Sequence, residues 1–422
     1  MIPAIIIFAL TYVLMIALPK YRYLVAFGSA IVTIAAGFLP IGELFGAIDW
    51  NILMMLSGTM ITVSVFIESK MPNRLADIIL SKCHNVMWVT VAMSLFAGIV
   101  SAFIDNVATV LMIAPVGLAV ARKLKISPTP MLIAIAVSSN LQGAATLVGD
   151  TTSIMLGGAA DMNFVEFFYM NRRPGIFWAV ELGALMTVPI IMLLFRKNRE
   201  RIEINERTEV SDYIPSVFLL LTVVLLIAAS FIPNKPAVTN GIICVTVAVA
   251  ALLYSIIRLR GFGSVKNAFE EFDWQTVVLL ASLFVVIAGI ESRGVIKALS
   301  ELMVKLGGNS LFLMYTIIVF GSVLISAFID NIPYVATMLP VVTGISSLMG
   351  VEPYVLYFGL LIGATLGGNL TPVGASANIA AIGILRKEGI EVKNSDFFRI
   401  GIPFTAAAVL TGYIFIWLVW AP

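Results

Sequence analysis

Apolar residues occur in runs of roughly 20 positions, which is the length that a membrane-spanning helix needs, and short polar segments separate the runs. Each run therefore predicts a membrane helix. The expected spans are residues 2–18, 23–41, 51–68, 129–160, 175–195, 213–232, 237–257, 274–291, 354–385 and 400–420. The runs at 129–160 and 354–385 are interrupted by small and polar residues. The pattern predicts an all-α polytopic membrane protein with about 10 transmembrane helices.

Composition supports a chain surrounded by a lipid bilayer. Of the 422 residues, 60% are apolar and 12% are charged, and the mean hydropathy is +1.03. A soluble chain has about 45–50% apolar and about 25% charged residues. The net charge of +2 indicates no nucleic-acid partner. The N-terminal run lacks a basic region and a cleavage site, so we interpret it as the first span.

Two further apolar stretches, 86–122 and 310–349, break in the middle at the same hexapeptide, SAFIDN, at 101–106 and 326–331. With the offset held at 225, residues 101–154 and 326–379 share 16 identities in 54 positions, and Asp-Trp pairs at 49–50 and 273–274 extend the match. The chain therefore consists of two halves that arose by internal duplication. We expect a first repeat at 1–195, a charged linker at 196–212 and a second repeat at 213–422.

Each half carries five spans and one broken stretch, and an odd number of spans predicts an inverted repeat. With the linker placed in the cytoplasm, 20 of the 26 Lys and Arg residues, Lys20 and Arg22 among them, fall in cytoplasmic loops. In most membrane proteins the loops that are rich in Lys and Arg face the cytoplasm. The charge pattern thus predicts a multi-pass protein of the cell (inner or plasma) membrane with both termini outside.

The broken stretches have two interpretations. Each arm could be a complete span joined by a tight turn, or the stretch could be a re-entrant hairpin whose tip stops inside the membrane. The turns carry Asp105-Asn106 and Asp330-Asn331 without a Lys or Arg anchor, which favours hairpins. The helix N-terminus that follows each turn would then face a ligand. Alternatively, Asp105 and Asp330 only cap those helices.

The interrupted runs contain Gly, Asn, Thr, Ser and Pro372 where a membrane helix should be apolar. Glycine and proline disturb the helical hydrogen bonds, and the freed carbonyls are good ligands for hard cations. Non-helical backbone inside a membrane is tolerated where it lines a cavity or is buried in protein. Small-residue helix packing explains the glycines but not the polar side chains gathered with them. The candidate ion- or substrate-binding residues in these runs are Asn140, Asp150, Thr151, Thr152, Asn369, Thr371, Ser376 and Asn378, and Thr109 of the stretch 86–122 is a further candidate.

The paired motifs SAFIDNVATVLMIAP and SAFIDNIPYVATMLP, followed by GAATLVGD and GGNLTPVGASANI, resemble the ArsB/NhaD permease branch of the ion transporter superfamily. That branch contains arsenite/antimonite and sodium/proton antiporters and is distantly related to divalent anion/sodium symporters. The resemblance implies two hairpins, two unwound helices, an elevator mechanism and a homodimer. It also implies two cation sites: Asp105, Asn106, Thr146, Gly149 and Asp150 in the first, and Asp330, Asn331, Thr371, Gly374 and Asn378 in the second. Thr151-Thr152-Ser153 is closer to the sodium/proton antiporters than to the Pro-Pro-Asn of much of the branch.

Asp105, Asp150 and Asp330 have no Lys, Arg or His within the two motif regions. Unpaired intramembrane carboxylates attract protons or sodium. We therefore predict a secondary transporter without catalytic residues or a resident cofactor, coupled to H⁺ or Na⁺. An antiporter that exports sodium or arsenite/antimonite in exchange for protons is favoured, because a di- or trianion would be repelled unless sodium bound first.

Two other functions stay open: a sodium-coupled symporter of dicarboxylate- or citrate-like anions, and an ion channel. An intramembrane aspartyl protease is disfavoured, since Asp105 and Asp330 both follow Ile rather than the residues of that enzyme class. The chain has no ATP-binding loop motif, so it cannot hydrolyse ATP itself, although a soluble ATPase partner stays open.

Overall fold

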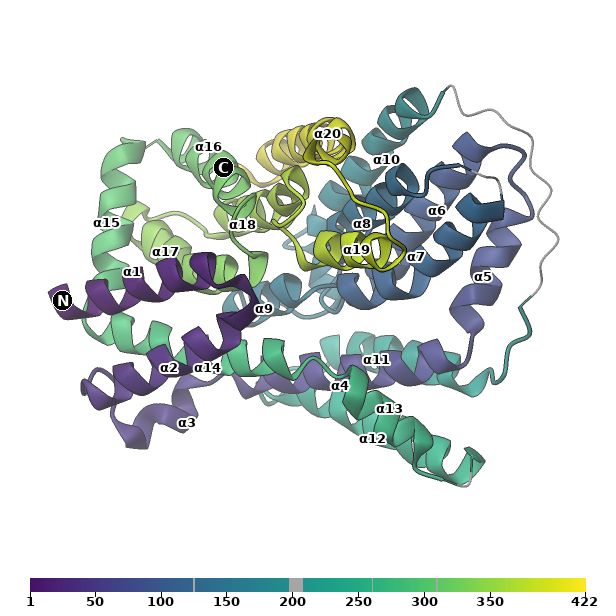
Figure 1. The fold of residues 1–422 in the computed structure, drawn as a ribbon. Helices are drawn as coiled ribbons and strands as arrows, with labels where there is room; N and C mark the ends of the chain where they lie inside the picture. Colours follow the sequence, from purple (N-terminus) through teal and green to yellow (C-terminus); the bar gives the residue numbers. More distant parts are fainter. Residues whose placement is uncertain (124–125, 197–207, 260, 309) are drawn as a thin grey trace.

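The computed structural model describes residues 1–123, 126–196, 208–259, 261–308 and 310–422 (Figure 1). Within these residues the chain is almost entirely helical, apart from one two-residue β pair, β1 (Tyr169–Met170) and β2 (Arg173–Pro174). The all-α prediction is confirmed. The part of the predicted linker at 197–207 lies outside the described residues.

The helices of the first half are α1 (Ile2–Ala17), η1 (Pro19–Tyr21), α2 (Arg22–Ala35), η2 (Ile41–Glu43), α3 (Leu44–Ala47), α4 (Trp50–Glu68), α5 (Met71–Leu80), α6 (Val86–Ser101), α7 (Asn106–Lys123), α8 (Thr129–Gly143), α9 (Thr151–Ala159), η3 (Val165–Phe167) and α10 (Ile176–Leu194). Those of the second half are α11 (Ile214–Ser230), α12 (Thr239–Leu259), α13 (Gly263–Glu271), α14 (Trp274–Ser292), α15 (Val295–Gly307), α16 (Leu311–Ser326), α17 (Asn331–Met349), α18 (Tyr354–Gly367), η4 (Gly368–Leu370), α19 (Ser376–Lys387) and α20 (Asn394–Trp420).

Among the described residues, seven helices are long and apolar enough to cross a membrane: α4, α7, α10, α12, α14, α17 and α20. Two bent helix pairs raise the number to nine if each counts as one span, and α6, α11 and α18 are shorter apolar helices. The expected span at 23–41 is shorter in the structure, because α2 ends at Ala35 and Gly37 adopts a positive φ of 69°. Glycine in this conformation commonly terminates a helix. The chain turns by 115° between α1 and the η1–α2 segment, so these helices form a V.

Two layers of helices are visible in Figure 1: α2, α4 and α11–α14 form the lower layer, and the hairpins and broken helices form most of the upper one. Within the lower layer α4 packs against α12, and α2 packs against α14. Gly58 permits the first contact, since a Cβ there would lie 2.4 Å from the carbonyl carbon of Cys244. The two layers meet where α4 contacts α9 and where α14 contacts α17.

The centre of the upper layer is formed by α8 and α18. Almost every residue of both helices is buried, including the polar residues Ser138, Ser139 and Asn140 of α8. In both halves this central helix packs on the first arm of the preceding hairpin, α6 on α8 and α16 on α18. Both central helices end at a break in the middle of an interrupted run, between α8 and α9 and between η4 and α19.

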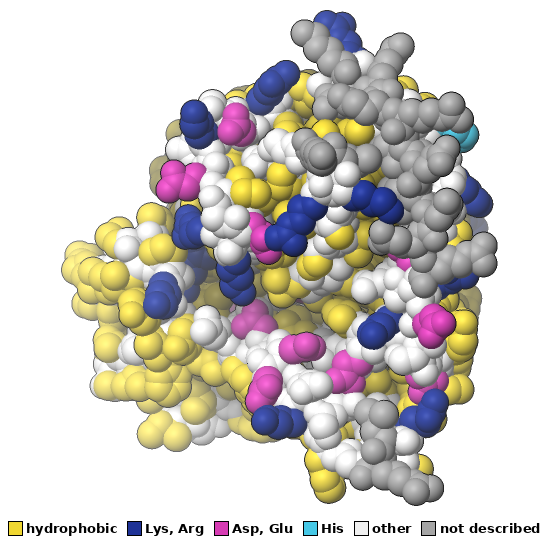
Figure 2. Space-filling model, turned by 45° about the vertical axis from the view of Figure 1, so that its right-hand side comes forward, with side chains coloured by type: hydrophobic (Ala, Val, Ile, Leu, Met, Phe, Trp, Pro, Cys, Tyr) yellow, Lys and Arg dark blue, Asp and Glu magenta, His cyan; other side chains and the backbone are white. Residues whose placement is uncertain are grey.

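Loop contacts join segments that the charge pattern assigns to one side of the membrane. The backbone N–H of Thr208 donates to Asp77 Oδ2 at 2.6 Å, and Arg122 forms an ion pair with Glu388. At the opposite side, Trp420 Nε1 donates to the carbonyl of Pro174 at 3.0 Å. Figure 2 shows hydrophobic side chains covering the lower left flank, and charged side chains of both signs spread over the rest of that face. These contacts agree with the predicted sidedness, which stays a prediction.

Candidate functional site

Each hairpin turn is bonded to the helix break that follows it. The hydroxyl of Thr146 donates to the carbonyl of Ala102, and the hydroxyl of Thr371 donates to the carbonyl of Ala327. Both donors and both acceptors differ by 225 in residue number. The two halves therefore repeat one contact, in which a threonine of the break satisfies a carbonyl that the end of a hairpin arm leaves free.

A glycine in each break makes this close approach possible. A Cβ at Gly149 would lie 2.6 Å from the carbonyl oxygen of Gly143, and one at Gly374 would lie 2.6 Å from that of Gly368. Carbonyls of the preceding hairpin turn are within 3 Å of both positions. No side chain fits there without backbone movement, so Gly149 and Gly374 pack the breaks onto the turns.

The turns and breaks enclose a cavity of about 40 Å³. Its walls include seven of the residues singled out from the sequence, and these are Asp105, Asn106, Asp150, Thr151, Asp330, Asn331 and Ser376. A buried water needs about 10–15 Å³ on this measure, whereas sites for drug-sized molecules have about 300–1,000 Å³. The cavity admits an ion or a few waters and excludes a larger solute in this conformation.

Two carboxylates of the cavity belong to the first half. Asp150 is buried and accepts hydrogen bonds from Thr151 N and from the Thr152 hydroxyl, both at 2.8 Å. Asp105 is half-buried and accepts from Val107 N at 2.9 Å and from Ala108 N at 3.2 Å. Both carboxylates thus stand at helix N-termini, which favour negative charge. No ion pair joins either one to a Lys or Arg within the ranges that the structure describes.

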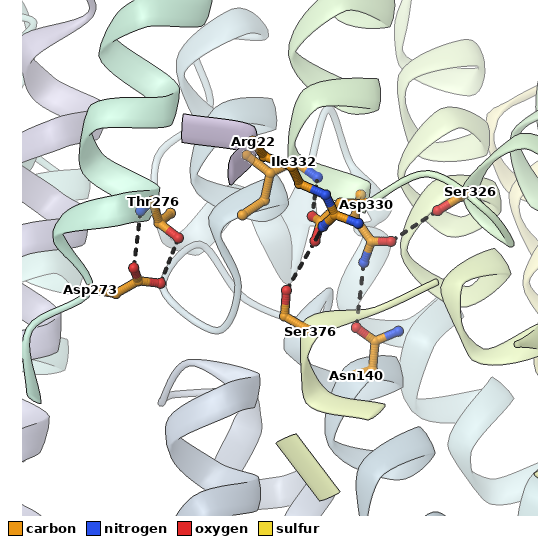
Figure 3. A network of polar contacts seen from close by, with 9 residues as sticks. Arg22, Asn140, Asp273, Thr276, Ser326, Asp330, Ile332 and Ser376 are labelled. Carbon is orange, nitrogen blue, oxygen red and sulfur yellow. Dashed lines mark hydrogen bonds and ion pairs between the residues drawn. The ribbon is translucent and has the colours of Figure 1, made fainter. Parts of the chain in front are cut away.

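Asp330 has a different environment (Figure 3). Its Oδ2 lies 2.7 Å from Arg22 Nη1 and accepts from the Ser376 hydroxyl at 3.0 Å. Arg22 begins α2, and its side chain is only 16% exposed. The charge pattern assigns Arg22 to a loop, whereas in the structure it is the first residue of a helix and its side chain is largely buried. Up to three of the carboxylates are expected to be unpaired, and Asp330 proves to be paired. The basic partner comes from outside the two motif regions, because folding brings α2 against the second hairpin.

Asp273 is a fourth carboxylate in the cavity wall, and it lies outside the set of candidates predicted from the sequence. It caps α14, accepting from Thr276 N at 3.0 Å and from the Thr276 hydroxyl at 2.6 Å. Together with Asp105 and Glu271 it also lines a neighbouring cavity of about 260 Å³. The repeated Asp-Trp pair was the signal in the sequence that could have identified it.

A buried asparagine network joins the two halves next to the cavity. Asn140 accepts from Asn106 Nδ2 at 3.0 Å and from Asn331 Nδ2 at 3.4 Å. Its own Nδ2 donates to Asn369 Oδ1 at 3.0 Å and to the carbonyl of Thr365 at 2.7 Å. Asn140 and Asn369 are fully buried and do not line the cavity, so their observed role is to fix both turns relative to α8 and α18.

The other candidates lie behind the cavity wall. The hydroxyl of Thr109 is 3.3 Å from the carbonyl of Ile104. Asn378 Nδ2 donates to the carbonyls of Gly368 at 3.0 Å and Thr371 at 3.2 Å. Asn378 Oδ1 is buried without a hydrogen-bond partner among the described residues. The structure thus brings the predicted binding residues together. Some of them face the cavity, and the others hold the cavity-lining residues in place from behind.

A bundle of apolar helices around a small polar cavity, at two broken helices, defines a membrane transporter rather than an enzyme. Comparison with known proteins supports this class. The family model described as "Citrate transporter" (CitMHS) matches residues 12–363 and 241–421, and the chain belongs to this family of the ion transporter superfamily. The predicted superfamily membership is confirmed.

Relatives match over nearly the whole chain. An uncharacterized transporter of Mycobacterium tuberculosis is 30% identical, and a 46 kDa membrane protein of Mycobacterium leprae is 31% identical, each over 98% of both chains. The human P protein is 26% identical over 87% of this chain and 53% of its own length. The crystal structure of the Alcanivorax borkumensis YdaH transporter, described as having an unusual topology, matches the fold with a TM-score of 0.60. It is 13% identical, and the match covers 89% of this chain and 87% of that one. The chain is a secondary transporter of the CitMHS family.

Proposed function

We propose that the transporter binds its coupling cation, H⁺ or Na⁺, between Asp105 and Asp150. The observation that carries this proposal is the acidic cavity: four carboxylates line it, and of these only Asp330 has a basic partner among the described residues. An ionisable group inside a membrane is costly without a partner. A bound cation at Asp105 and Asp150 would offset that cost, and the volume of about 40 Å³ suits an ion.

Antiport follows if one pair of carboxylates accepts two ions in turn. A proton and a sodium ion compete for the same oxygens, so each would have to leave before the other binds. Arsenite and antimonite are neutral hydroxides at neutral pH, and the threonine and serine hydroxyls near the breaks could hold them without thiols. We therefore propose export of sodium or arsenite/antimonite in exchange for protons.

An elevator movement and a homodimer belong to the same proposal. The two helix layers support the movement, because the hairpins and broken helices lie mostly in one layer (Figure 1). That layer could move as a unit past α4, α12 and α14 and carry Asp105 and Asp150 with it. An inverted repeat, as predicted from the sequence, would explain how one scaffold could open to either side.

The second candidate function is sodium-coupled symport of a citrate-like anion, which the description of the family favours. The cavity of about 260 Å³ offers more room than the central one, but Asp105, Glu271 and Asp273 line it. A di- or trianion would meet repulsion from these carboxylates unless cations bound before it. The central acidic cavity thus supports cation binding in either mode of coupling.

The test uses proteoliposomes with an acidic interior and a pH-sensitive dye. Sodium, lithium or arsenite is added outside in turn, and we expect one of them to dissipate the proton gradient. Asp105→Asn and Asp150→Asn should abolish the response, since the amide is nearly the same size as the carboxylate but carries no charge. Asp396→Asn, which removes an exposed carboxylate in the first turn of α20, is the matched control and should respond like the wild type.

Three results would contradict the antiporter. If Asp105→Asn and Asp150→Asn both respond like the wild type, proton movement does not depend on the proposed site. Citrate uptake driven by sodium, without any exchange of protons for sodium or arsenite, would establish the symporter instead. Large unitary currents in planar bilayers would indicate a channel.

A further inference from the structure

The two halves carry different charges at equivalent positions. Asp105 corresponds to Asp330 at the offset of 225, but Asp150 corresponds to Ala375. The first half therefore presents two carboxylates to the cavity. At these positions the second half presents one carboxylate, Asp330, and Arg22 lies against it, while Asp273 reaches the cavity from α14. The duplicated turns and breaks are thus asymmetric in charge.

The carboxylate of Asp330 is satisfied by groups of the chain itself. Oδ2 contacts Arg22 Nη1 at 2.7 Å and the Ser376 hydroxyl at 3.0 Å, and Oδ1 accepts from Ile332 N at 3.2 Å. The side chains of Arg22 and Asp330 are 16% and 8% exposed. A guanidinium bonded to a largely buried carboxylate neutralises its charge, so this carboxylate does not need an external cation.

Backbone carbonyls at the second break are occupied as well. Asn378 Nδ2 donates to the carbonyls of both Gly368 and Thr371. The equivalent residue of the first half, Ser153, donates to the carbonyl of Gly143 only, at 3.2 Å. Hard cations bind through several oxygen ligands at once. At the second break the oxygens that would serve this purpose already accept hydrogen bonds, and the unpartnered Asn378 Oδ1 is one neutral acceptor.

We propose that the Arg22 guanidinium takes the place of a second coupling cation at Asp330. Each chain then has one exchangeable cation site, at Asp105 and Asp150, and one site, at Asp330, that Arg22 fills in this conformation. The inference rests on the proposed function in one respect, because the exchangeable site at Asp105 and Asp150 is the coupling-cation site of that proposal. It replaces the two cation sites that the family resemblance implies with one site and a fixed positive charge.

The experiment counts sodium ions bound to the purified full-length protein by equilibrium binding of radioactive sodium at alkaline pH. Arg22→Gln should bind one more Na⁺ per chain than the wild type, because it exposes the Asp330 carboxylate. Arg22→Gln combined with Asp330→Asn should lose that additional ion. Arg22→Lys keeps a positive charge and should bind no additional ion. Lys20→Gln removes the neighbouring exposed positive charge and should match the wild type.

A second measurement does not depend on folding of the Arg22→Gln protein. Asp330→Asn alone should leave the number of bound Na⁺ unchanged, because Arg22 and not sodium occupies Asp330 in the wild type. Loss of one Na⁺ in Asp330→Asn would overturn the inference, and so would an Arg22→Gln protein that folds and binds no additional ion. Failure of the proposed function is visible separately, as wild-type transport that does not change in Asp105→Asn and Asp150→Asn.

Discussion

At the scale of single residues, the equivalent turns show how a duplicated sequence acquires two different sites. Asp105 and Asp330 follow the same four residues, Ser-Ala-Phe-Ile, and both stand at a helix N-terminus. What distinguishes them is the neighbour supplied by the rest of the fold, which is Asp150 in one half and Arg22 in the other. The hairpin motif therefore specifies the position of the carboxylate. Residues distant in the sequence determine whether a positive or a negative side chain lies beside it.

The glycines of the breaks lead to a first prediction about stability. Gly374→Ala would place a methyl group 2.6–2.9 Å from three backbone carbonyls, and overpacking of this kind typically costs about 1–3 kcal/mol. We expect a lower melting temperature in detergent and a loss of transport. The matched control is Gly321→Ala in α16, where nothing lies within 4 Å of the added Cβ and alanine favours the helix by up to about 1 kcal/mol. Equal melting temperatures for the two variants would contradict the packing role.

At the scale of elements, two helices of the lower layer begin with the same cap but face different cavities. Asp49 accepts from Ile52 N at 3.0 Å at the start of α4, and Asp273 accepts from Thr276 N at 3.0 Å at the start of α14. Asp49 lines a separate cavity together with Gly157 and Gly158 of α9, whereas Asp273 lines the central one. Asp49 and Asp273 thus share the capping role, but only Asp273 adds charge to the central cavity. Comparing variants of the two residues separates the effect of the cap from the effect of the charge.

We predict that Asp273→Asn weakens activation of transport by the cation, while Asp49→Asn does not. Asparagine caps a helix about as well as aspartate does, so both variants should keep the melting temperature of the wild type. Only the first removes negative charge from the central cavity. The measurement is initial transport rate against cation concentration. An unchanged half-saturating concentration in Asp273→Asn would restrict the role of this residue to capping.

The elements also show how far sequence reasoning reaches. Apolar runs, the repeated hexapeptide and the polar interruptions led to the breaks and to Asp105, Asp150 and Asp330, because these signals are local in the chain. Arg22 could not be found in this way, since 308 residues separate it from Asp330 and a basic residue between apolar runs is typical of a loop. The division of the candidates into cavity-lining and supporting residues also depends on tertiary packing, as the buried Asn140 demonstrates.

At the scale of the whole molecule, the orientation in the membrane remains to be tested, and the native cysteines offer a direct way to do so. The chain has two cysteines, of which Cys244 is buried in α12 and Cys83 is half-buried between α5 and α6. The charge pattern assigns Lys82, next to Cys83, to the cytoplasmic side. Cys83 is therefore a reporter of that side.

We predict that a membrane-impermeant maleimide labels Cys83 in inside-out vesicles and not in right-side-out vesicles. Burial raises the pKa of the Cys83 thiol, and the thiolate is the reactive form. A raised pKa means less thiolate at neutral pH, so labelling should be slow there and accelerate as the pH rises. Cys83→Ser should remove the signal, and Lys297→Cys in that background, at an exposed position expected outside, should be labelled from the opposite face. Labelling of Cys83 in right-side-out vesicles would invert the predicted topology, and the termini would then face the cytoplasm.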